Sequence, residues 1–192
     1  MADAKRQKAG PTRVIIDTDP GIDDMMAILL AFGAKEIIVE GLTIVCGNGK
    51  DITKLGANAK LLARVAGYAD VPVCLGAAPP DDDEVAKDVP VHVHGEDGLG
   101  NKAAQFGRTD ADFTNFHPKS AAAFIAETCA ASPGEITLIA IGLLAPAGLR
   151  RALWLLRLRL RYRSALLGGI LHAVLRCCAA GAWLLRISSF SD

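Results

Sequence analysis

The chain carries four aspartates within eight residues, at Asp17, Asp19, Asp23 and Asp24. Carboxylates at this spacing repel one another unless a cation lies among them, and oxygen ligands are those that Ca²⁺ and Mg²⁺ prefer. Helix capping is the simplest other use of such residues, but it requires only one carboxylate or two. Capping therefore leaves Asp17 and Asp19 unexplained, and the spacing predicts a site for a divalent metal or a sugar.

The residues around these aspartates predict a strand, a tight turn and a helix. Residues 14–16 are β-branched and apolar, as in a buried strand, and Pro20 and Gly21 supply the turn. Apolar residues then recur at helical spacing at Ile22, Met25, Met26 and Leu29. The aspartates are thus expected at the carboxyl end of a strand, where open α/β sheets bind their ligands.

The same alternation of strand and helix continues along the chain. Further strands are expected at 37–45, 71–75 and 136–141, and further helices at 51–66 and from about 118 to 131. Repeated βαβ units imply a parallel sheet. We therefore expect an α/β fold with a Rossmann-like open, mainly parallel sheet, helices on both faces, and an incomplete sheet after the fourth strand.

A long loop is expected between residues 76 and 116. Its acidic run at 79–84 is best explained as solvated surface. The segment 92–100 combines His92 and His94 with three glycines, which allow a loop to approach a ligand closely. Long loops inside compact domains are often functional, so both histidines are candidates for the site.

The composition is that of a globular protein. The 192 residues are 51% apolar and carry no formal net charge, which suits one domain with a sizeable core and argues against a nucleic-acid partner. The five cysteines lack metal-type spacing, so buried free thiols in a reducing compartment are expected. Residues 1–12 are polar without an apolar signal region, which predicts a flexible N-terminus and a cytoplasmic protein.

Four motifs follow one another along residues 13–142. They are the run from Asp17 to Asp24 after a strand, Gly47-Asn48 after the second strand, His94-Gly95 in the long loop, and a strand that ends at Gly142. Together, and in this order, they resemble the inosine-uridine preferring nucleoside hydrolases. The resemblance implies that family's α/β fold and hydrolysis of the N-glycosidic bond of purine or pyrimidine nucleosides to ribose and free base.

The resemblance also implies a calcium site. Its metal-binding residues would be Asp17, Asp19, Asp24 and the main-chain carbonyl of Ile141, with Asp17 supporting the others. Asp19 would act as the general base for the attacking water, whose pKa a bound Ca²⁺ depresses. The neighbouring carboxylates would stabilise the positive charge that develops on the sugar.

Substrate binding is implied in the same way. Asp23 and Asn48 would hold the ribose hydroxyls and so orient the sugar. His94 would lie near the base as a catalytic residue, although His92 fits the same motif. The expected partners are nucleosides such as uridine or inosine, without nucleic acid or membrane, and an intact chain would be consistent with a family-like homo-oligomer.

The resemblance ends at Gly142. The family is expected to continue with Pro-Leu-Thr-Asn, whereas this chain reads Leu143-Leu144-Ala145-Pro146. Residues 143–192 form an atypical Arg/Leu-rich tail, because the chain between Ile136 and Ser191 has eight arginines but no Asp, Glu or Lys.

Three interpretations of this tail follow from its composition. Residues 156–163 would suit a basic strand or anion-binding face, and residues 164–185 a membrane segment. Buried arginine is costly, however, and the basic run is not helically amphipathic. The interpretation we favour is a frame-shifted, mis-spliced or mis-predicted end.

Three functions follow from these observations. The first is a nucleoside hydrolase, impaired because the family's last calcium aspartate and a base-contacting histidine would fall beyond Gly142. The second is an inactive binding or regulatory fragment. The third is a phosphatase of the haloacid-dehalogenase type with Asp17 as nucleophile, a pattern from which Pro20 and Gly21 depart. We expect the 192-residue chain to release little or no ribose by itself.

Overall fold

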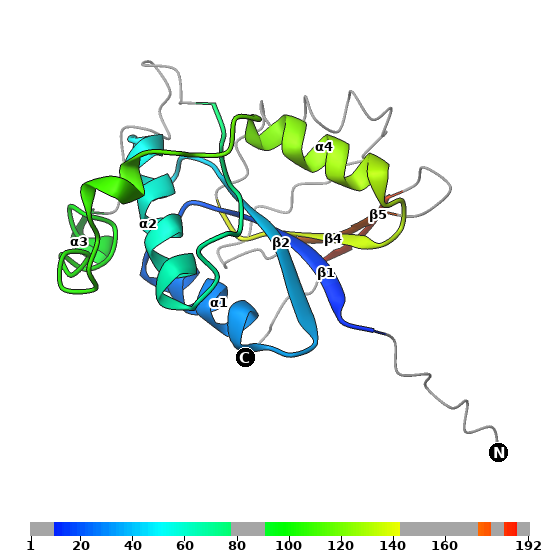
Figure 1. The fold of residues 1–192 in the computed structure, drawn as a ribbon, viewed down its shortest axis with the longest axis horizontal. Coiled ribbons are helices and arrows are strands. Elements are labelled where there is room, and N and C mark those ends of the chain that lie inside the picture. The colour runs from blue at the N-terminus through cyan, green and yellow to red at the C-terminus, as the bar shows by residue number, and fades with distance from the viewer. Residues whose placement is uncertain (1–9, 78–90, 143–172, 178–182, 188–192) are drawn as a thin grey trace.

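The computed structural model describes residues 10–77, 91–142, 173–177 and 183–187 (Figure 1). Its strands form one sheet in the order β3-β2-β1-β4-β5-β6. Their bounds are β1 Thr12–Thr18, β2 Ile37–Ile44, β3 Val73–Leu75, β4 Ile136–Ala140, β5 Ala173–Cys177 and β6 Trp183–Ile187. β1 to β4 pair in parallel, and β5 and β6 add antiparallel strands. The predicted open, mainly parallel sheet is confirmed.

β1 is the central strand of the parallel part. It lies between β2 and β4, and its residues Val14, Ile15 and Ile16 are buried. A parallel strand covered on both faces needs such a continuous apolar run. The register places Asp17 between Thr43 of β2 and Ala140 of β4, so the first motif aspartate belongs to the strand itself.

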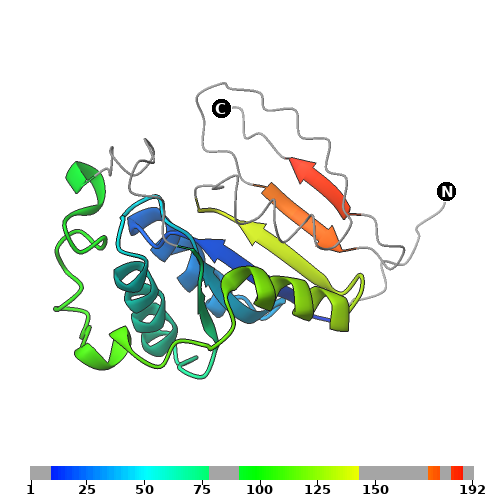
Figure 2. The ribbon, with the colours of Figure 1, turned by 90° about the horizontal axis from the view of Figure 1, so that it is seen from above.

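Helices cover both faces of the parallel strands, as predicted (Figures 1 and 2). Their bounds are α1 Ile22–Gly33, α2 Ile52–Val65 and α4 Ala121–Ala131. α1 and α2 share a core with Val14 and Ile16, whereas α4 shares one with Ile15. Side chains alternate between the two faces of a strand, so this division shows which face each residue of β1 points to.

The buried face of α1 differs from the prediction at one position. Met25 and Leu29 pack against the core as expected, but Met26 is 66% exposed. Ile28 and Phe32 are buried in its place. At 100° per residue, positions 25, 28, 29 and 32 form one stripe, and position 26 falls on the opposite side.

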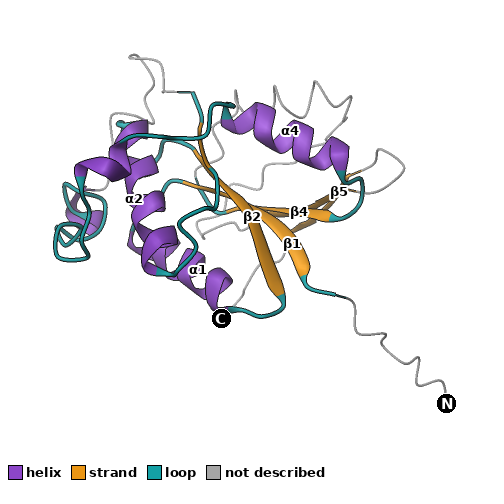
Figure 3. Ribbon diagram, viewed as in Figure 1, coloured by secondary structure: helices purple, strands orange, loops and turns teal. Residues whose placement is uncertain are grey.

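The segment between β3 and α4 is only partly the loop that we predicted. It contains the short helix α3 Val91–His94 and the 3₁₀ helix Asp110–Phe113, both coloured as helices in Figure 3. The predicted helix at 51–66 is confirmed as α2, whose N-cap Asp51 accepts hydrogen bonds from the backbone amides of Thr53 and Lys54. The acidic run 79–84 lies outside the described residues.

Two strands come from the part predicted as an atypical tail. β5 pairs with β4 and β6 pairs with β5, so the sheet continues past the fourth strand, where we expected it to be incomplete. Both strands are rich in apolar residues that suit a sheet. Residues 156–163 lie outside the described part. Within the described ranges, no helix is long and apolar enough to span a membrane.

Among the described residues, Cys46, Cys74 and Cys129 form no disulfide, as expected. Cys74 and Cys129 are buried, and Cys46 is partly exposed. Burial raises the pKa of the Cys74 thiol to about 12. Cys74 therefore stays protonated and packs as a small apolar side chain.

Candidate active site

The carboxyl ends of β1, β2 and β4 meet at one edge of the sheet. The carbonyl of Thr18 accepts a hydrogen bond from the amide of Val45 at 3.0 Å. The carbonyl of Asp17 accepts from the amides of Ile141 and Gly142 at 2.9 and 3.1 Å. These bonds hold the ends of β2 and β4 against residues 17–24, which we call the acidic turn.

Asp17 faces the side of the sheet that α4 covers. Thr43 Oγ1 donates to Asp17 Oδ1 at 2.5 Å, and both side chains are buried. Burial raises the pKa of Asp17 to about 6, although the hydrogen bond from Thr43 lowers it. Asp17 is only 3% exposed at the end of β1.

Thr18 and Asp24 face the opposite side, toward α1. Thr18 Oγ1 donates to Asp24 Oδ1 at 2.6 Å, and both residues are buried. Burial raises the pKa of Asp24, the bond from Thr18 opposes that rise, and the charge of Asp23 adds to it. A cation beside Asp24 would lower this raised pKa and hold the carboxylate ionised.

Asn48 joins Asp19 to Asp24. Its backbone amide donates to Asp19 Oδ2 at 2.9 Å, and its side-chain Nδ2 donates to the carbonyl of Asp19 at 3.0 Å. The same Nδ2 lies 3.3 Å from Asp24 Oδ2. Asn48 therefore contacts two aspartates of a separate motif, and it is partly exposed at the edge of the group.

His94 approaches the acidic turn from residues 91–103, which we call the histidine loop. The amide of Ile22 donates to His94 Nδ1 at 3.2 Å, so in the neutral ring the proton lies on Nε2. Asp23 Oδ1 is 3.9 Å from the same Nδ1, and the Asp23 side chain is 61% exposed. His92 is exposed, whereas His94 is buried beside the turn.

Gly21 and Gly142 permit the close approach of these segments. A Cβ on Gly21 would lie 2.6 Å from Asn48 Nδ2 and 2.7 Å from His94 Nδ1. A Cβ on Gly142 would lie 2.9 Å from the backbone nitrogen of Asp19. Both glycines therefore leave space that a side chain would fill, and Gly21 lets Asn48 and His94 reach the turn together.

The oxygen atoms at this edge are of the types that bind a hard cation. Asp19 and Asp24 supply buried carboxylates, and Ile141, whose amide is bonded to the carbonyl of Asp17, directly follows β4. Ca²⁺ takes six to eight oxygen ligands, so these residues would supply only part of its coordination. Among the described residues, no group of three or more His, Cys, Asp and Glu side chains is arranged to hold a metal ion. The calcium ligands, including Asp17, stay a prediction.

A family model described as inosine-uridine preferring nucleoside hydrolase matches residues 14–147. The chain belongs to this family. It is 42% identical over 132 residues to uridine nucleosidase 1 of Arabidopsis thaliana, covering 68% of this chain and 37% of that relative. It is 45% identical over 91 residues to the inosine-uridine preferring nucleoside hydrolase of Leishmania major, covering 47% and 28%.

A solved plant nucleoside hydrolase shares the fold. It superposes with a TM-score of 0.66 at 36% sequence identity, covering 76% of this chain and 43% of that chain. The chain thus spans less than half the length of the relatives it matches. The family match contains every residue that we predicted for the site, from Asp17 to Ile141.

Several contributors to this candidate site were missed by the sequence analysis. Thr43 and Thr18 bond the two aspartates on opposite faces of the sheet. For Thr18 the alternation of side chains along β1 was a usable signal, because the residue next to Asp17 must point to the other face of the sheet. Asn58, in the middle of α2, gave no such signal, because an isolated polar residue in a helix has no predictable partner.

The histidine loop is folded around Asp97. Its carboxylate accepts hydrogen bonds from the amides of Leu99, Asn101 and Ala103, each at 2.8 Å. Burial alone would raise the pKa of Asp97, but these bonds outweigh it and the pKa is lowered. Gly95, Gly98 and Gly100 all have positive φ angles, which accounts for the cluster of glycines noted in the sequence.

Proposed function

We propose that this chain carries the ribose-binding and calcium-binding part of a nucleoside hydrolase site, which cleaves nucleosides to ribose and free base. The observation that supports this most directly is the contact of Asn48 with both Asp19 and Asp24, beside Asp23 and His94. This group of residues combines two buried carboxylates with an exposed carboxylate and an amide, and it lies in a chain of the nucleoside hydrolase family.

The proposed roles follow from exposure and hydrogen bonding. Asp23 is exposed and carries an acceptor pair suited to two ribose hydroxyls, and Asn48 supports the same sugar from the neighbouring strand end. Asp19 accepts the proton of the attacking water as general base. His94 can donate from Nε2 toward the nucleoside, because Nδ1 accepts from Ile22.

Calcium would be held by Asp19, Asp24 and the carbonyl of Ile141, with Asp17 supporting the strand end. When bound, the ion supplies positive charge that favours deprotonation of water. The protein's own contribution is to hold Asp19 through the backbone amide of Asn48 and Asp24 through Thr18. These two bonds orient the carboxylates before any ligand arrives.

The phosphatase alternative is less well supported. A nucleophilic Asp17 would have to reach a phosphorus atom, yet its carboxylate faces the α4 side of the sheet and accepts a hydrogen bond from Thr43. The family match also favours the nucleoside hydrolase. An inactive binding fragment differs from the proposal only in turnover, which the experiment below measures.

Nucleoside binding and turnover can be tested separately. Calorimetric titration of the 192-residue chain with uridine and inosine should give binding that needs calcium and that Asp23→Asn weakens. Ribose release should be measured in the same chain and in a chimera of residues 1–142 with the C-terminal part of the Arabidopsis relative. Absence of both binding and ribose release would refute the proposal.

Two properties of the whole protein also stay predictions. A cytoplasmic location follows from the free thiols, and a homo-oligomer follows from the family resemblance. Sedimentation of the purified chain and fractionation of its cells would test them.

A further inference from the structure

Asn58 is a fully buried amide between the acidic turn and the histidine loop. It lies on α2 with 0% exposure. Its Nδ2 donates to the carbonyl of Asp97 at 2.9 Å and to the carbonyl of Pro20 at 3.4 Å, and its Oδ1 accepts from Arg108 Nη1 at 2.7 Å. One side chain thus bonds the turn, the loop and a cation.

The packing around Asn58 leaves no room for adjustment. A Cβ on Gly98 would lie 2.8 Å from Asn58 Nδ2 and 3.4 Å from the carbonyl of Pro20. Gly98 also has a φ of +80°. The loop backbone therefore passes directly against the amide, which explains why a glycine is needed there.

Arg108 fixes the orientation of this amide. Its Nη1 bonds Asn58 Oδ1 and also the carbonyl of Asp97 at 3.2 Å. An amide that accepts from a guanidinium on one side must present its NH₂ group to the other, toward Pro20 and Asp97. The charge on Arg108 thus prevents the flipped arrangement.

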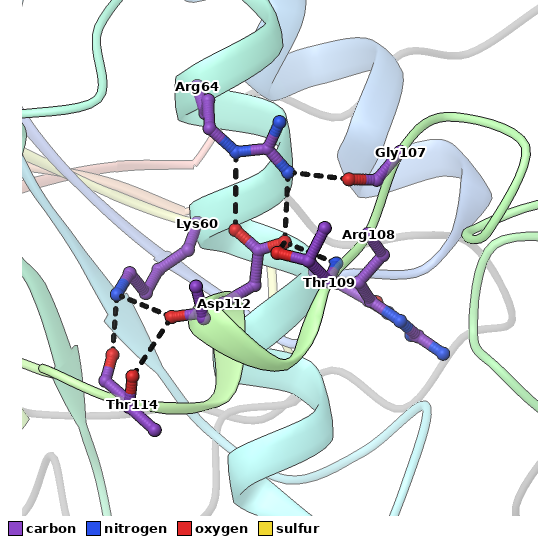
Figure 4. A network of polar contacts seen from close by, with 9 residues as sticks. Lys60, Arg64, Gly107, Arg108, Thr109, Asp112 and Thr114 are labelled. Carbon is purple, nitrogen blue, oxygen red and sulfur yellow. Dashed lines mark hydrogen bonds and ion pairs between the residues drawn. The ribbon is translucent and has the colours of Figure 1, made fainter.

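Arg108 is itself held by a separate network on α2 (Figure 4). Arg64 donates to Asp112 Oδ2 at 2.9 Å and to the carbonyl of Gly107 at 2.8 Å, and the amide of Thr109 donates to Asp112 at 2.9 Å. In Figure 4 the guanidinium of Arg108 points away from Asp112. The network therefore anchors the backbone of Arg108 and leaves its side chain for Asn58.

The histidine loop behaves as one unit in these contacts. Asp97 bonds three of its amides, and the carbonyl of His94 accepts from the amide of Gly100 at 2.7 Å. The loop is bonded to the turn at His94, whose Nδ1 accepts from Ile22 at 3.2 Å, and through Asn58. Displacing Asp97 should therefore displace His94 with it.

We propose that Asn58, oriented by Arg108, is a positioning residue that sets His94 against the acidic turn. The inference rests on the proposed function only for the consequence that nucleoside binding weakens when the pair is broken. Asp19, Asp24 and Asn48 have their own mutual bonds, so they keep their arrangement when Asn58 is changed. Asn58 bonds the turn at the carbonyl of Pro20, so we expect the larger change on the histidine side of the site.

The test uses the full 192-residue chain with two variants and a matched control. Asn58→Leu removes the amide at similar volume, and Arg108→Ala removes its orienting partner while leaving the core intact. Lys60→Met is the control, because Lys60 lies on the same helix and bonds the carbonyls of Ala111 and Thr114, which lie outside the segment that anchors Arg108. Nitrogen-15 NMR of the histidine rings reads the state of His94 without any substrate.

In the wild type the His94 signals should show an unprotonated, hydrogen-bonded Nδ1 and a protonated Nε2. Asn58→Leu and Arg108→Ala should change those signals, whereas Lys60→Met should lower the melting temperature and leave them unchanged. Wild-type His94 signals in Arg108→Ala, or an equal change in Lys60→Met, would overturn the proposal. If Asn58→Leu does not fold, Arg108→Ala decides alone.

A binding cycle tests the consequence for the site. Asn58→Leu should weaken uridine binding on the order of tenfold. The same change made in His94→Ala should add little, because the effects of two residues coupled through one hydrogen-bond network are not additive. Additive losses would contradict action through His94. If the chain binds no nucleoside at all, the proposed function fails while the NMR result still decides the role of Asn58.

Discussion

The acidic turn and the histidine loop meet at the same site but are stabilised differently. The turn continues a buried strand into a helix, and its aspartates accept bonds from Thr18 within the turn and from Thr43 and Asn48 on and after β2. The loop has little core of its own and depends on Asp97 and on Asn58 from α2. One half of the site is therefore held by the sheet, and the other half is held by a few polar contacts.

Turnover should depend most strongly on the turn. Asp19→Asn keeps the size of the side chain but removes the proton acceptor, so ribose release should fall by roughly 10²–10⁴-fold. The assay is ribose production from uridine by the chimera described above, with nucleoside binding as the control, which should fall much less. Hydrolysis at the wild-type rate would remove Asp19 from the role of base.

Gly21→Ala should separate the two halves. The new Cβ would meet both Asn48 and His94, and overpacking of this kind costs about 1–3 kcal/mol of stability. Uridine binding should weaken by about tenfold or more, measured by calorimetry, together with a lower melting temperature. Gly33→Ala is the matched control, because nothing lies within 4 Å of a Cβ placed there and binding should be unchanged.

Asp97→Asn should loosen the loop while leaving the turn intact. Loss of hydrogen bonds to a charged acceptor should cost about 1–3 kcal/mol in the free energy of unfolding near neutral pH. Because the folded-state pKa of Asp97 is lowered, its stabilisation is present above the unfolded pKa and is lost as pH falls through the folded pKa.

Urea unfolding of wild type and Asp97→Asn at neutral and at strongly acidic pH measures this difference. The two proteins should differ most near neutrality and converge in acid. A gap that is constant with pH would mean that the charge of Asp97 is not what holds the loop.

Calcium should have the smallest effect. The described residues supply two carboxylates and a carbonyl, so binding should be weak, and an excess of about tenfold over Kd would stabilise the fold by about 1.4 kcal/mol. The melting temperature should then rise by a few degrees, and Asp24→Asn should abolish the rise. A melting curve that is insensitive to millimolar calcium would argue against a formed metal site.

Much of the fold could be predicted from periodicity and turn residues. The apolar run at Val14–Ile16, the helix after Asp51 and the strand at Ile136–Ala140 are local patterns, and each is present within one or two residues of the prediction. β5 and β6 could not be predicted, because their pairing depends on which edge of the sheet is available. Met26 was misassigned because Met25 and Met26 both fit a loose helical stripe.

The gathering of carboxylates at the end of β1 and the close approach of a glycine-rich histidine segment could be predicted from the chain, since both depend on neighbours in sequence. The face that each aspartate occupies depends on packing, because the two faces of the sheet differ only once α1 and α4 cover them. It also decided between His92 and His94 as the residue beside the turn. The role of Asn58 was decided at the same level, because its three partners, Pro20, Asp97 and Arg108, are brought together by packing and not by any periodicity along the chain.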